Sequence, residues 1–589
     1  MVRRTAGRPY RRFGLIVSMA FLGATVLGGN SIAASGTHDR FHASSVDADE
    51  GGESGEAAEK KDILHFEAEA AENPVTGTQI LVSRCRFEPF AGDVNVYDPL
   101  ATWEHDVIVD DTDFEFADGT SCWNPQNEQN IVINPTNRLN IVTSANDYRY
   151  EFRCFVYVTM DGGDTWQNVA LPGWSVPTGA KGNFKSGGCG GDPVLAFGPD
   201  GTLYFSALTY YFDQFPAHQA SGVAVSSSQD GGLTWTDPVM VHYAASGDFF
   251  NDKEWIGVGP DGTVYVTWTK FYQGPRGFSY VKSPIVMATS RTGGKSWSSV
   301  KEVSDAAHPF NQGSQVGVAP DGTLYVAYEA TSPEFGYTTD ALVVARSTNG
   351  GTTFTNTEVA RVFDDLDCYP IQEPGGQGRQ TLTYEQFRMN SYPSMAIDPT
   401  NGNIAIVWAD NEGNGSCGTG GTEYVGPGTS NQVKLVTSAD GLSWSPVDMI
   451  TDTPADKVFP SVGANAGLIS VGYYTRDYSP IPTDTDRLCG IVELDDETGE
   501  LVLPEDAGRR NAPVCLDWAL RTSADSFASQ IRVTSQSSNP YILFAGSFIG
   551  DYEGTAVDDQ GTTVTTWTDF RGNPGVTSPN QDTFVAIFP

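Results

Sequence analysis

Three arginines stand in three separate late segments of the chain: Arg388 in FRMNSYP, Arg476 in YYTRD and Arg571 in TDFRG. A guanidinium group is planar and pairs bidentately with a carboxylate. Arginines that converge from separate segments are therefore suited to clamp an anionic ligand. Asp551 in GDYEG and Asp569 in TDFRG accompany them, and we expect both aspartates to bind substrate as well.

Tyrosines and carboxyl groups stand close together in the same kinds of segment. Tyr552 is followed by Glu553, Tyr474 lies in YYTRD, and Asp252 and Glu254 lie in FNDKEW. A tyrosine beside a carboxylate can lose its proton to it, and a second carboxyl group can act as a general acid or base. These five residues are the catalytic candidates. The alternative is that acids and arginines pair with one another and join neighbouring parts of the fold.

Two other chemistries are open. Asp192, Asp252 and Asp551 offer hard oxygen ligands that could share a structural Ca²⁺, although no contiguous loop has calcium-binding spacing, and we expect no catalytic metal or organic cofactor. His242 or His308 with a tyrosine would suit a polysaccharide lyase.

The elements that must position these residues are repeats. One turn recurs as VTMDGGDTW, SSSQDGGLTW, ATSRTGGKSW, ARSTNGGTTF and VTSADGLSW, ending at Trp166, Trp235, Trp297, Phe354 and Trp444, with a sixth remnant in RTSADSF. An apolar strand leads into the turn, where the Asp accepts backbone N–H groups and the glycines adopt positive φ. An aromatic residue then begins the next strand. We expect these turns to build structure and to do no chemistry.

A second phrase recurs seven times between these turns, as in AFGPDGTLYFSAL, GVGPDGTVYVTWT and GVAPDGTLYVAYE. Each copy predicts two strands joined by a tight turn. One full unit is then a four-stranded antiparallel meander, and a ring of such sheets is a β-propeller. The copies predict an all-β fold with seven blades, with six as the alternative, and a strand from residues 78–84 or 105–111 completing the last blade.

The candidate residues share a place in this repeat. The first strand of each propeller blade lines the central channel, and the loops before that strand and after the second strand meet at one face. The candidate acids, arginines and tyrosines stand in those two loops, so we expect them to gather on one rim.

The S-x-D-G-G-x-T-W phrase resembles the Asp box, or bacterial neuraminidase repeat, of the sialidase-like β-propeller superfamily across about residues 130–589. The resemblance implies an exo-glycosidase acting on sialic acid or another acidic sugar. It implies that Arg388, Arg476 and Arg571 grip the sugar carboxylate, with Tyr552 or Tyr474 as nucleophile. The Phe/Tyr-Arg-Ile-Pro phrase that carries the first family arginine is absent. A non-catalytic glycan- or protein-binding propeller is the alternative.

The N-terminal residues predict export. Five arginines precede the run FGLIVSMAFLGATVLGG and the small residues SIAAS, which is typical of a secretory signal over 1–33. Residues 34–76 are acidic and poor in aromatics, which predicts a disordered linker or pro-segment. We expect residues 77–589 to form the propeller. Eight cysteines fit disulfides in a secreted chain. The net charge of −38 disfavours nucleic acid and anionic membranes as partners, and we expect a monomer that binds carbohydrate.

Overall fold

The computed structural model describes residues 125–147, 154–211, 220–333, 340–363, 387–411, 431–479, 515–570 and 581–588. Within these ranges there are short gaps at 186, 245–248, 274–279 and 543–547, and several isolated residues and short strands outside them are described as well. All of them belong to the unit Gly52–Pro589. The predicted signal (1–33) and linker (34–76), Arg571, and Cys85, Cys368 and Cys417 lie outside the described residues.

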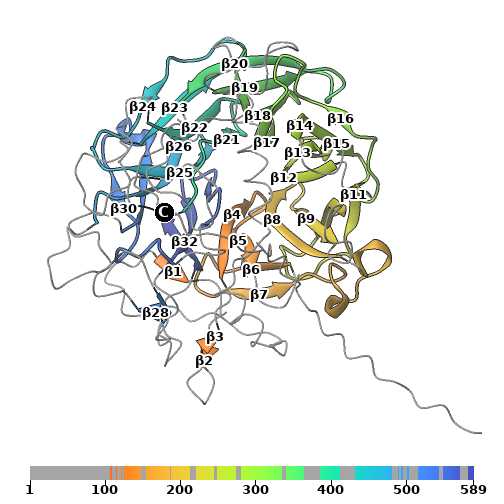
Figure 1. Cartoon of the computed structure of the whole chain (residues 1–589), viewed down its shortest axis with the longest axis horizontal. Coiled ribbons are helices and arrows are strands. Elements are labelled where there is room, and N and C mark those ends of the chain that lie inside the picture. The colour runs from red at the N-terminus through yellow and green to blue at the C-terminus, as the bar shows by residue number, and fades with distance from the viewer. Residues whose placement is uncertain are drawn as a thin grey trace, which may run out of the picture. The chain divides into compact units, whose positions relative to one another are not determined.

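Seven four-stranded antiparallel sheets form the seven blades of a β-propeller (Figure 1). The innermost strands are β4 (Gln126–Asn134), β8 (Gly187–Phe197), β12 (Phe249–Val258), β17 (Asn311–Val318), β21 (Ser394–Ile397), β25 (Lys457–Asn465) and β31 (Gly554–Val557). Each innermost strand contacts the next, and β31 contacts β4, which closes the ring. The predicted fold class is confirmed, with seven blades and not six.

The second strands are β5 (Asn137–Asp147), β9 (Leu203–Tyr211), β13 (Val264–Gln273), β18 (Leu324–Thr331), β22 (Ile404–Asp410), β26 (Leu468–Thr475) and β32 (Thr563–Asp569). The third strands are β6 (Phe155–Thr159), β10 (Ala220–Ser228), β15 (Ile285–Ser290), β19 (Asp340–Ser347), β23 (Gln432–Ser438), β29 (Asp517–Thr522) and β33 (Asp582–Phe588). The outer strands are β7 (Gln167–Ala170), β11 (Val239–Ala244), β16 (Lys301–Glu302), β20 (Thr355–Val362), β24 (Asp448–Met449), β30 (Ile531–Arg532) and β1 (Asp106–Ile108).

The last blade is completed by β1, whose Asp106 lies opposite Ala586 of β33. The prediction that residues 105–111 supply this strand is therefore confirmed. Short additions are β14 (Tyr280–Lys282) on blade 3, the pairs β2 (Phe114–Glu115) with β3 (Ser121–Cys122) and β27 (Glu493–Leu494) with β28 (Leu501–Val502), and three 3₁₀ turns, η1 (Val176–Thr178), η2 (Gly182–Lys185) and η4 (Ser523–Asp525).

The core is divided among the blade interfaces. Seven apolar clusters of described residues each join two neighbouring sheets. Trp268, for example, is fully buried between blades 2 and 3, and Trp567 between blades 6 and 7. Because each sheet is covered on both faces by its neighbours, successive residues of the inner strands are buried on either face, as along β18 and β22.

Two disulfides add covalent links. Cys154–Cys189 joins the start of blade 1's third strand to β8 of blade 2, and Cys489–Cys515 closes a loop of blade 6. Among the described residues, no helix is long and apolar enough to cross a membrane.

The Asp-Gly-Gly turns lie at the far end of the third strands. In blade 2, Asp230 accepts the backbone N–H of Thr234 (2.9 Å) and the hydroxyls of Ser228 (2.8 Å) and Thr234 (2.5 Å), while Gly232 donates its N–H to Ser228 Oγ (2.9 Å). Gly232 has φ +102°, which explains the glycine. The same hydrogen bond to a Ser or Thr oxygen recurs at Gly163, Gly294 and Gly351.

Candidate functional site

The innermost strands share an irregularity near their first residues. The pairing with the second strand slips in blades 1, 2, 3, 4 and 6. At each slip one residue is left-handed: Glu128 (φ +59°), Asp192 (+56°), Lys253 (+49°), Gly313 (+68°) and Phe459 (+48°). Four of these are not glycine, and such backbone strain is uncommon outside functional sites. Extra residues of this kind re-aim side chains.

These residues share one sequence position. Each stands seven residues before the Pro of the recurring Pro-Asp-Gly phrase or the residue that replaces it. Blades 5 and 7 have Tyr392 and Tyr552 at that position. Each blade thus has one residue at this position of its innermost strand, and we call this set the axial ring: Glu128, Asp192, Lys253, Gly313, Tyr392, Phe459 and Tyr552.

A buried ammonium group joins the acids of this end of the channel. Lys253 Nζ lies 2.5 Å from Glu128 Oε1, 2.6 Å from Asp551 Oδ2 and 3.6 Å from Asp192 Oδ2. Arg388 grips the same Asp551 with its Nε (3.0 Å) and Nη2 (2.6 Å). All five side chains are buried, so the four blades and one incoming segment that carry them are tied together by charge.

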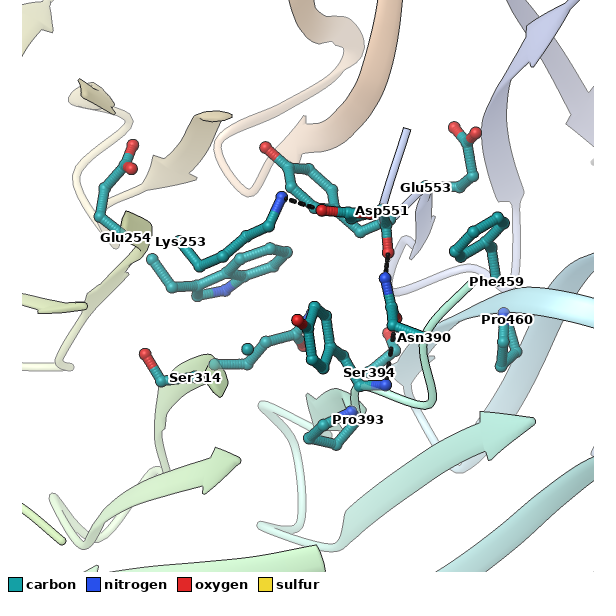
Figure 2. A pocket seen from close by; sticks show the side chains of 15 residues that line it. Lys253, Glu254, Ser314, Asn390, Pro393, Ser394, Phe459, Pro460, Asp551 and Glu553 are labelled. Atoms are coloured by element: carbon teal, nitrogen blue, oxygen red, sulfur yellow. Dashed lines mark hydrogen bonds and ion pairs between the residues drawn. The ribbon is translucent and has the colours of Figure 1, made fainter. Parts of the chain in front are cut away.

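A cavity of about 30 Å³ lies beside this network, and Figure 2 shows the residues around it. Lys253 and Asp551 point toward one another there, and Glu254 and Glu553 lie on opposite sides of the view. The volume holds about two water molecules. The lining comprises Lys253, Glu254, Trp255, Gly313, Ser314, Gln315, Asn390, Tyr392, Pro393, Ser394, Phe459, Pro460, Asp551, Tyr552 and Glu553.

Several polar groups that line the cavity are buried without a hydrogen-bond partner among the described residues. The hydroxyl of Tyr552 and both carboxyl oxygens of Glu254 have no hydrogen-bond partner in another described residue, and neither has Glu553 Oε2. An unsatisfied buried polar group costs about 1–3 kcal/mol. Native structures hold few such groups, and each one calls for an explanation such as a ligand, an ordered water or a catalytic role.

The pKa values of the carboxyl groups are shifted in opposite directions. Burial, reinforced by the charge of Asp192, raises the pKa of Glu254 well above its usual range, and burial does the same to the pKa of Glu553. Burial raises the pKa of Asp252 to about 7. Burial alone would also raise the pKa of Asp551, but the charges of Arg388 and Lys253 outweigh it and hold that pKa below its usual range. Carboxyl groups with raised and with lowered pKa values therefore line one cavity.

The two candidate tyrosines have different surroundings. Tyr552 lies in the axial ring, with the Lys253 ammonium 5.3 Å from its ring centre and Trp255 packed at 5.6 Å. Tyr474 does not line the cavity; its hydroxyl lies 2.7 Å from Glu553 Oε1, and its ring packs on Trp518 at 4.9 Å. The expected pairing of a tyrosine with Glu553 thus exists, but the partner is Tyr474 and not its sequence neighbour Tyr552.

The predicted arginines do not meet around a common ligand among the described residues. Arg388 binds Asp551, whereas Arg476 binds Asp456 and Glu385, each at 2.7 Å. Both guanidinium groups are buried. Each is engaged by carboxylates of its own chain, as in the alternative interpretation that acids and arginines join the blades.

Of the remaining candidates, Asp569 is buried at the end of β32, where it accepts the indole N–H of Trp567 (3.1 Å), and it does not line the cavity. Asp252 accepts a hydrogen bond from Gln312 (2.6 Å). No group of three or more metal-ligating side chains occurs among the described residues. Asp192 and Asp551 converge as the calcium hypothesis requires, but the Lys253 ammonium lies between them.

The two histidines lie apart from the cavity. His242 stacks on Trp268 at 5.6 Å between blades 2 and 3. His308 lies within hydrogen-bond distance of Asp305 (2.8 Å) and Glu358 (3.1 Å). Neither histidine lines the cavity, so neither is placed to act as a base there.

Sequence reasoning missed Glu128, Trp255 and Tyr392, and it gave Lys253 no role. The fixed offset of seven residues before the recurring turn would have found Glu128, Lys253 and Tyr392, because all seven copies obey it. Trp255 follows two positions later in blade 3.

No protein family or curated protein matches this chain. Solved structures similar to it include a Dyadobacter fermentans protein of unknown function (12% identity, 67% of this chain and 93% of that chain, TM-score 0.39) and a Hadza microbial sialidase (13%, 76% and 73%, 0.37). A third is a Penicillium chrysogenum α-L-arabinanase complexed with arabinobiose (15%, 64% and 94%, 0.38). At these scores the similarities carry no argument about activity.

Proposed function

We propose that this chain is an exported glycoside hydrolase that cleaves its substrate at the mouth of the axial cavity. The observation that carries the proposal is that Glu254 and Asp551 line one cavity, where burial raises the pKa of Glu254 and the charges of Arg388 and Lys253 hold the pKa of Asp551 below its usual range. Pairs of carboxyl groups whose pKa values are pushed apart are typical of glycosidases, where one donates a proton to the leaving group and the other stabilises positive charge or activates the nucleophile.

Each group then has a defined part. Glu254, whose pKa is raised by burial and by the charge of Asp192, acts as the general acid. Asp551, fixed as a carboxylate by Arg388 and Lys253, stabilises the positive charge that develops on the sugar ring. The Tyr552 hydroxyl, which lacks a partner, is free to bind the substrate or to attack it. The cavity accommodates the water, and the sugar ring lies above it.

A sialic acid or another acidic sugar is the substrate class we propose. Arg388 and Arg476 do not supply the carboxylate clamp, because each is already paired with acids of the chain. Export fits the disulfides Cys154–Cys189 and Cys489–Cys515, since such bonds persist in oxidising compartments.

One observation favours a non-catalytic glycan-binding propeller as the second candidate. Lys253, Arg388 and the acids around them satisfy one another, as residues that only join blades would. A lyase is less well supported, because neither His242 nor His308 lines the cavity.

The test is hydrolysis of fluorogenic aryl glycosides of sialic acid, uronic acids and neutral sugars by the purified mature protein. We expect Glu254→Gln to lower kcat by about 10²–10⁴-fold on a glycoside with a poor, weakly acidic leaving group, which is the usual contribution of a general acid. The control is Asp164→Asn, which removes an exposed carboxyl group from the Asp-Gly-Gly turn of blade 1 and should leave kcat unchanged. Failure of the wild-type protein to cleave any of these glycosides would favour the binding propeller.

A further inference from the structure

A second cluster of aromatic and basic residues lies at the same end of blade 3 as the axial cavity. Lys270 Nζ stands 4.1 Å from the ring centre of Phe249 and 5.2 Å from that of Tyr272. Lys282 Nζ of β14 stands 4.7 Å from the same Tyr272 ring. The two rings meet edge to face at 4.7 Å. Cation–π contacts therefore hold two ammonium groups beside one tyrosine.

The strand pattern explains how these residues come together. Trp268, Lys270 and Tyr272 alternate along β13, so they share one face of the sheet. Trp268 is fully buried against His242 of blade 2, whereas Lys270 and Tyr272 are only partly buried. The row thus runs from the interface between the two blades out to solvent.

The cluster has more positive than negative charge. Lys282 is paired with Glu302 (3.0 Å), but Lys270 has no carboxylate within 4 Å among the described residues. Burial lowers the pKa of Lys270, and although the charge of Glu302 raises it, the charge of Lys282 lowers it further. Two adjacent cations repel each other. A chain with a net charge of −38 that keeps an unpaired lysine in such a place is suited to receive an anion.

The cluster is also within reach of the cavity. Lys270 lies opposite Asn251 on β12, only two residues from Lys253 in the axial ring. Lys253 itself lies in the irregular stretch of β12 between Asp252 and Trp255, so the cavity and the cluster are neighbours at one end of blade 3. A glycan that extends from the cavity over this end of the blade therefore passes Lys270.

We propose that Lys270, held by Phe249 and Tyr272 beside Lys282, binds the anionic substituent of the glycan, either a carboxylate or a sulfate. The inference rests on the proposed function for the position of the neighbouring sugar. It assigns recognition of the acidic group to a lysine and two aromatic rings of blade 3, whereas the sequence predicted an arginine clamp. The hydrolytic groups and the anion-binding group are then separate.

Isothermal titration of the full mature protein with 3′-sialyllactose, lactose 3′-sulfate and lactose tests this assignment. We expect the wild-type protein to prefer the two anionic sugars over lactose, and Lys270→Gln to weaken their binding about tenfold or more, the worth of one charge-assisted hydrogen bond. Lys301→Gln, which removes an exposed lysine from β16 of the same blade, should bind as wild type does. If the protein prefers one of the two anionic sugars, that preference identifies the substituent bound at Lys270 as a carboxylate or a sulfate.

Equal binding of lactose and both anionic sugars, or unchanged binding by Lys270→Gln, would overturn the subsite. Every titration is made in proteins that also carry Glu254→Gln, which suppresses turnover of 3′-sialyllactose, so the outcome is separate from hydrolysis. Loss of anion binding in Lys270→Gln, in a protein that cleaves no glycoside, would support the subsite and reject the hydrolase. Cleavage by a protein that shows no preference for anionic sugars would support the hydrolase and reject the subsite.

Discussion

The outer turns and the axial ring are built from the same repeat, yet they differ in what the repeat preserves. The Asp-Gly-Gly turns keep similar residues in several blades, and Asp161 and Asp230 make matching hydrogen bonds. The axial ring keeps a left-handed backbone in five blades and changes its side chains, from Glu128 to Lys253 to Phe459. Residues that recur in every blade therefore build the blade, and residues that differ at a recurring position are where function is expected.

Protonation separates the two regions as well. Burial slightly opposes ionisation of Asp230, but hydrogen bonds from Thr234 lower the pKa of this carboxyl group. In the axial region burial is not offset for Asp252 and Glu254, and their pKa values rise. Hydrogen bonds in the turn stabilise the ionised form of Asp230, whereas burial in the channel favours the protonated form of Asp252 and Glu254.

The strongest way to break the axial region is Lys253→Met. It leaves the buried acids Glu128, Asp192 and Asp551 without the ammonium between them. Removing one partner of a buried charged group costs about 3–5 kcal/mol, and we expect that loss in the free energy of unfolding measured by denaturant titration. Lys181→Met, which breaks the exposed pair with Asp237, should cost less than about 1 kcal/mol. Equal costs for the two variants would show that the axial network is not a stabilising unit.

A pH series distinguishes the two kinds of carboxyl group. The pKa of Asp252 rises from its ordinary value of 3.8 to about 7, so the folded chain keeps a proton that the unfolded chain loses in this window. Asp252 therefore lowers the stability of the wild-type protein increasingly as pH rises from about 4 to 7. Asp252→Asn lacks this loss and still accepts the Gln312 hydrogen bond.

The gain of Asp252→Asn over wild type should grow through that window, to at most about 4 kcal/mol, and stay level above it. Asp230→Asn should show the opposite trend. Because the pKa of Asp230 is lowered, its contribution is present above its ordinary pKa and is lost as pH falls. Parallel curves for the two variants would contradict the division between the regions.

A smaller effect is expected at one outer turn. Asp230→Ala removes the acceptor of the Thr234 backbone N–H and hydroxyl, which should cost about 1 kcal/mol, as the loss of a helix cap does. Asp230→Asn is the matched control, because Asn349 already occupies this position in blade 4 and accepts the N–H of Thr353. Thermal unfolding of both variants measures the difference. A loss of hydrolysis in Asp230→Ala at full stability would mean that the turns do more than build blades.

Most of the fold could be predicted from the sequence, because hairpin turns are local. The side chain of Asp230 and the positive φ of Gly232 are explained by contacts within five residues, and the recurring phrases predict the strand order and favour seven blades over six. The strand that closes the ring was predicted as one of two segments, residues 78–84 or 105–111, and the pairing of β1 with β33 distinguishes them.

The site could be predicted only in part. The expected rim does gather Glu254, Asp551, Tyr552 and Glu553 around one cavity. Which acid meets which cation depends on how seven blades converge on one axis, and no local signal shows that Lys253 reaches Asp551 across the channel. For the same reason Arg388 and Arg476 suggested a free clamp, although each has a buried carboxylate partner supplied from a distant segment.

The central claim is that the axial cavity is where the glycoside is cleaved, and Tyr552→Phe tests it most directly. The Tyr552 hydroxyl has no hydrogen-bond partner in another described residue, so its removal should leave the free energy of unfolding within about 1 kcal/mol of wild type. Tyr474→Phe is the matched control, a buried tyrosine outside the cavity that loses its bond to Glu553. We predict that kcat/KM on the best glycoside falls about 100-fold or more in Tyr552→Phe at unchanged stability. Full activity in Tyr552→Phe, with activity lost in Tyr474→Phe at full stability, would contradict the account and move the reaction to the interface between blades 6 and 7.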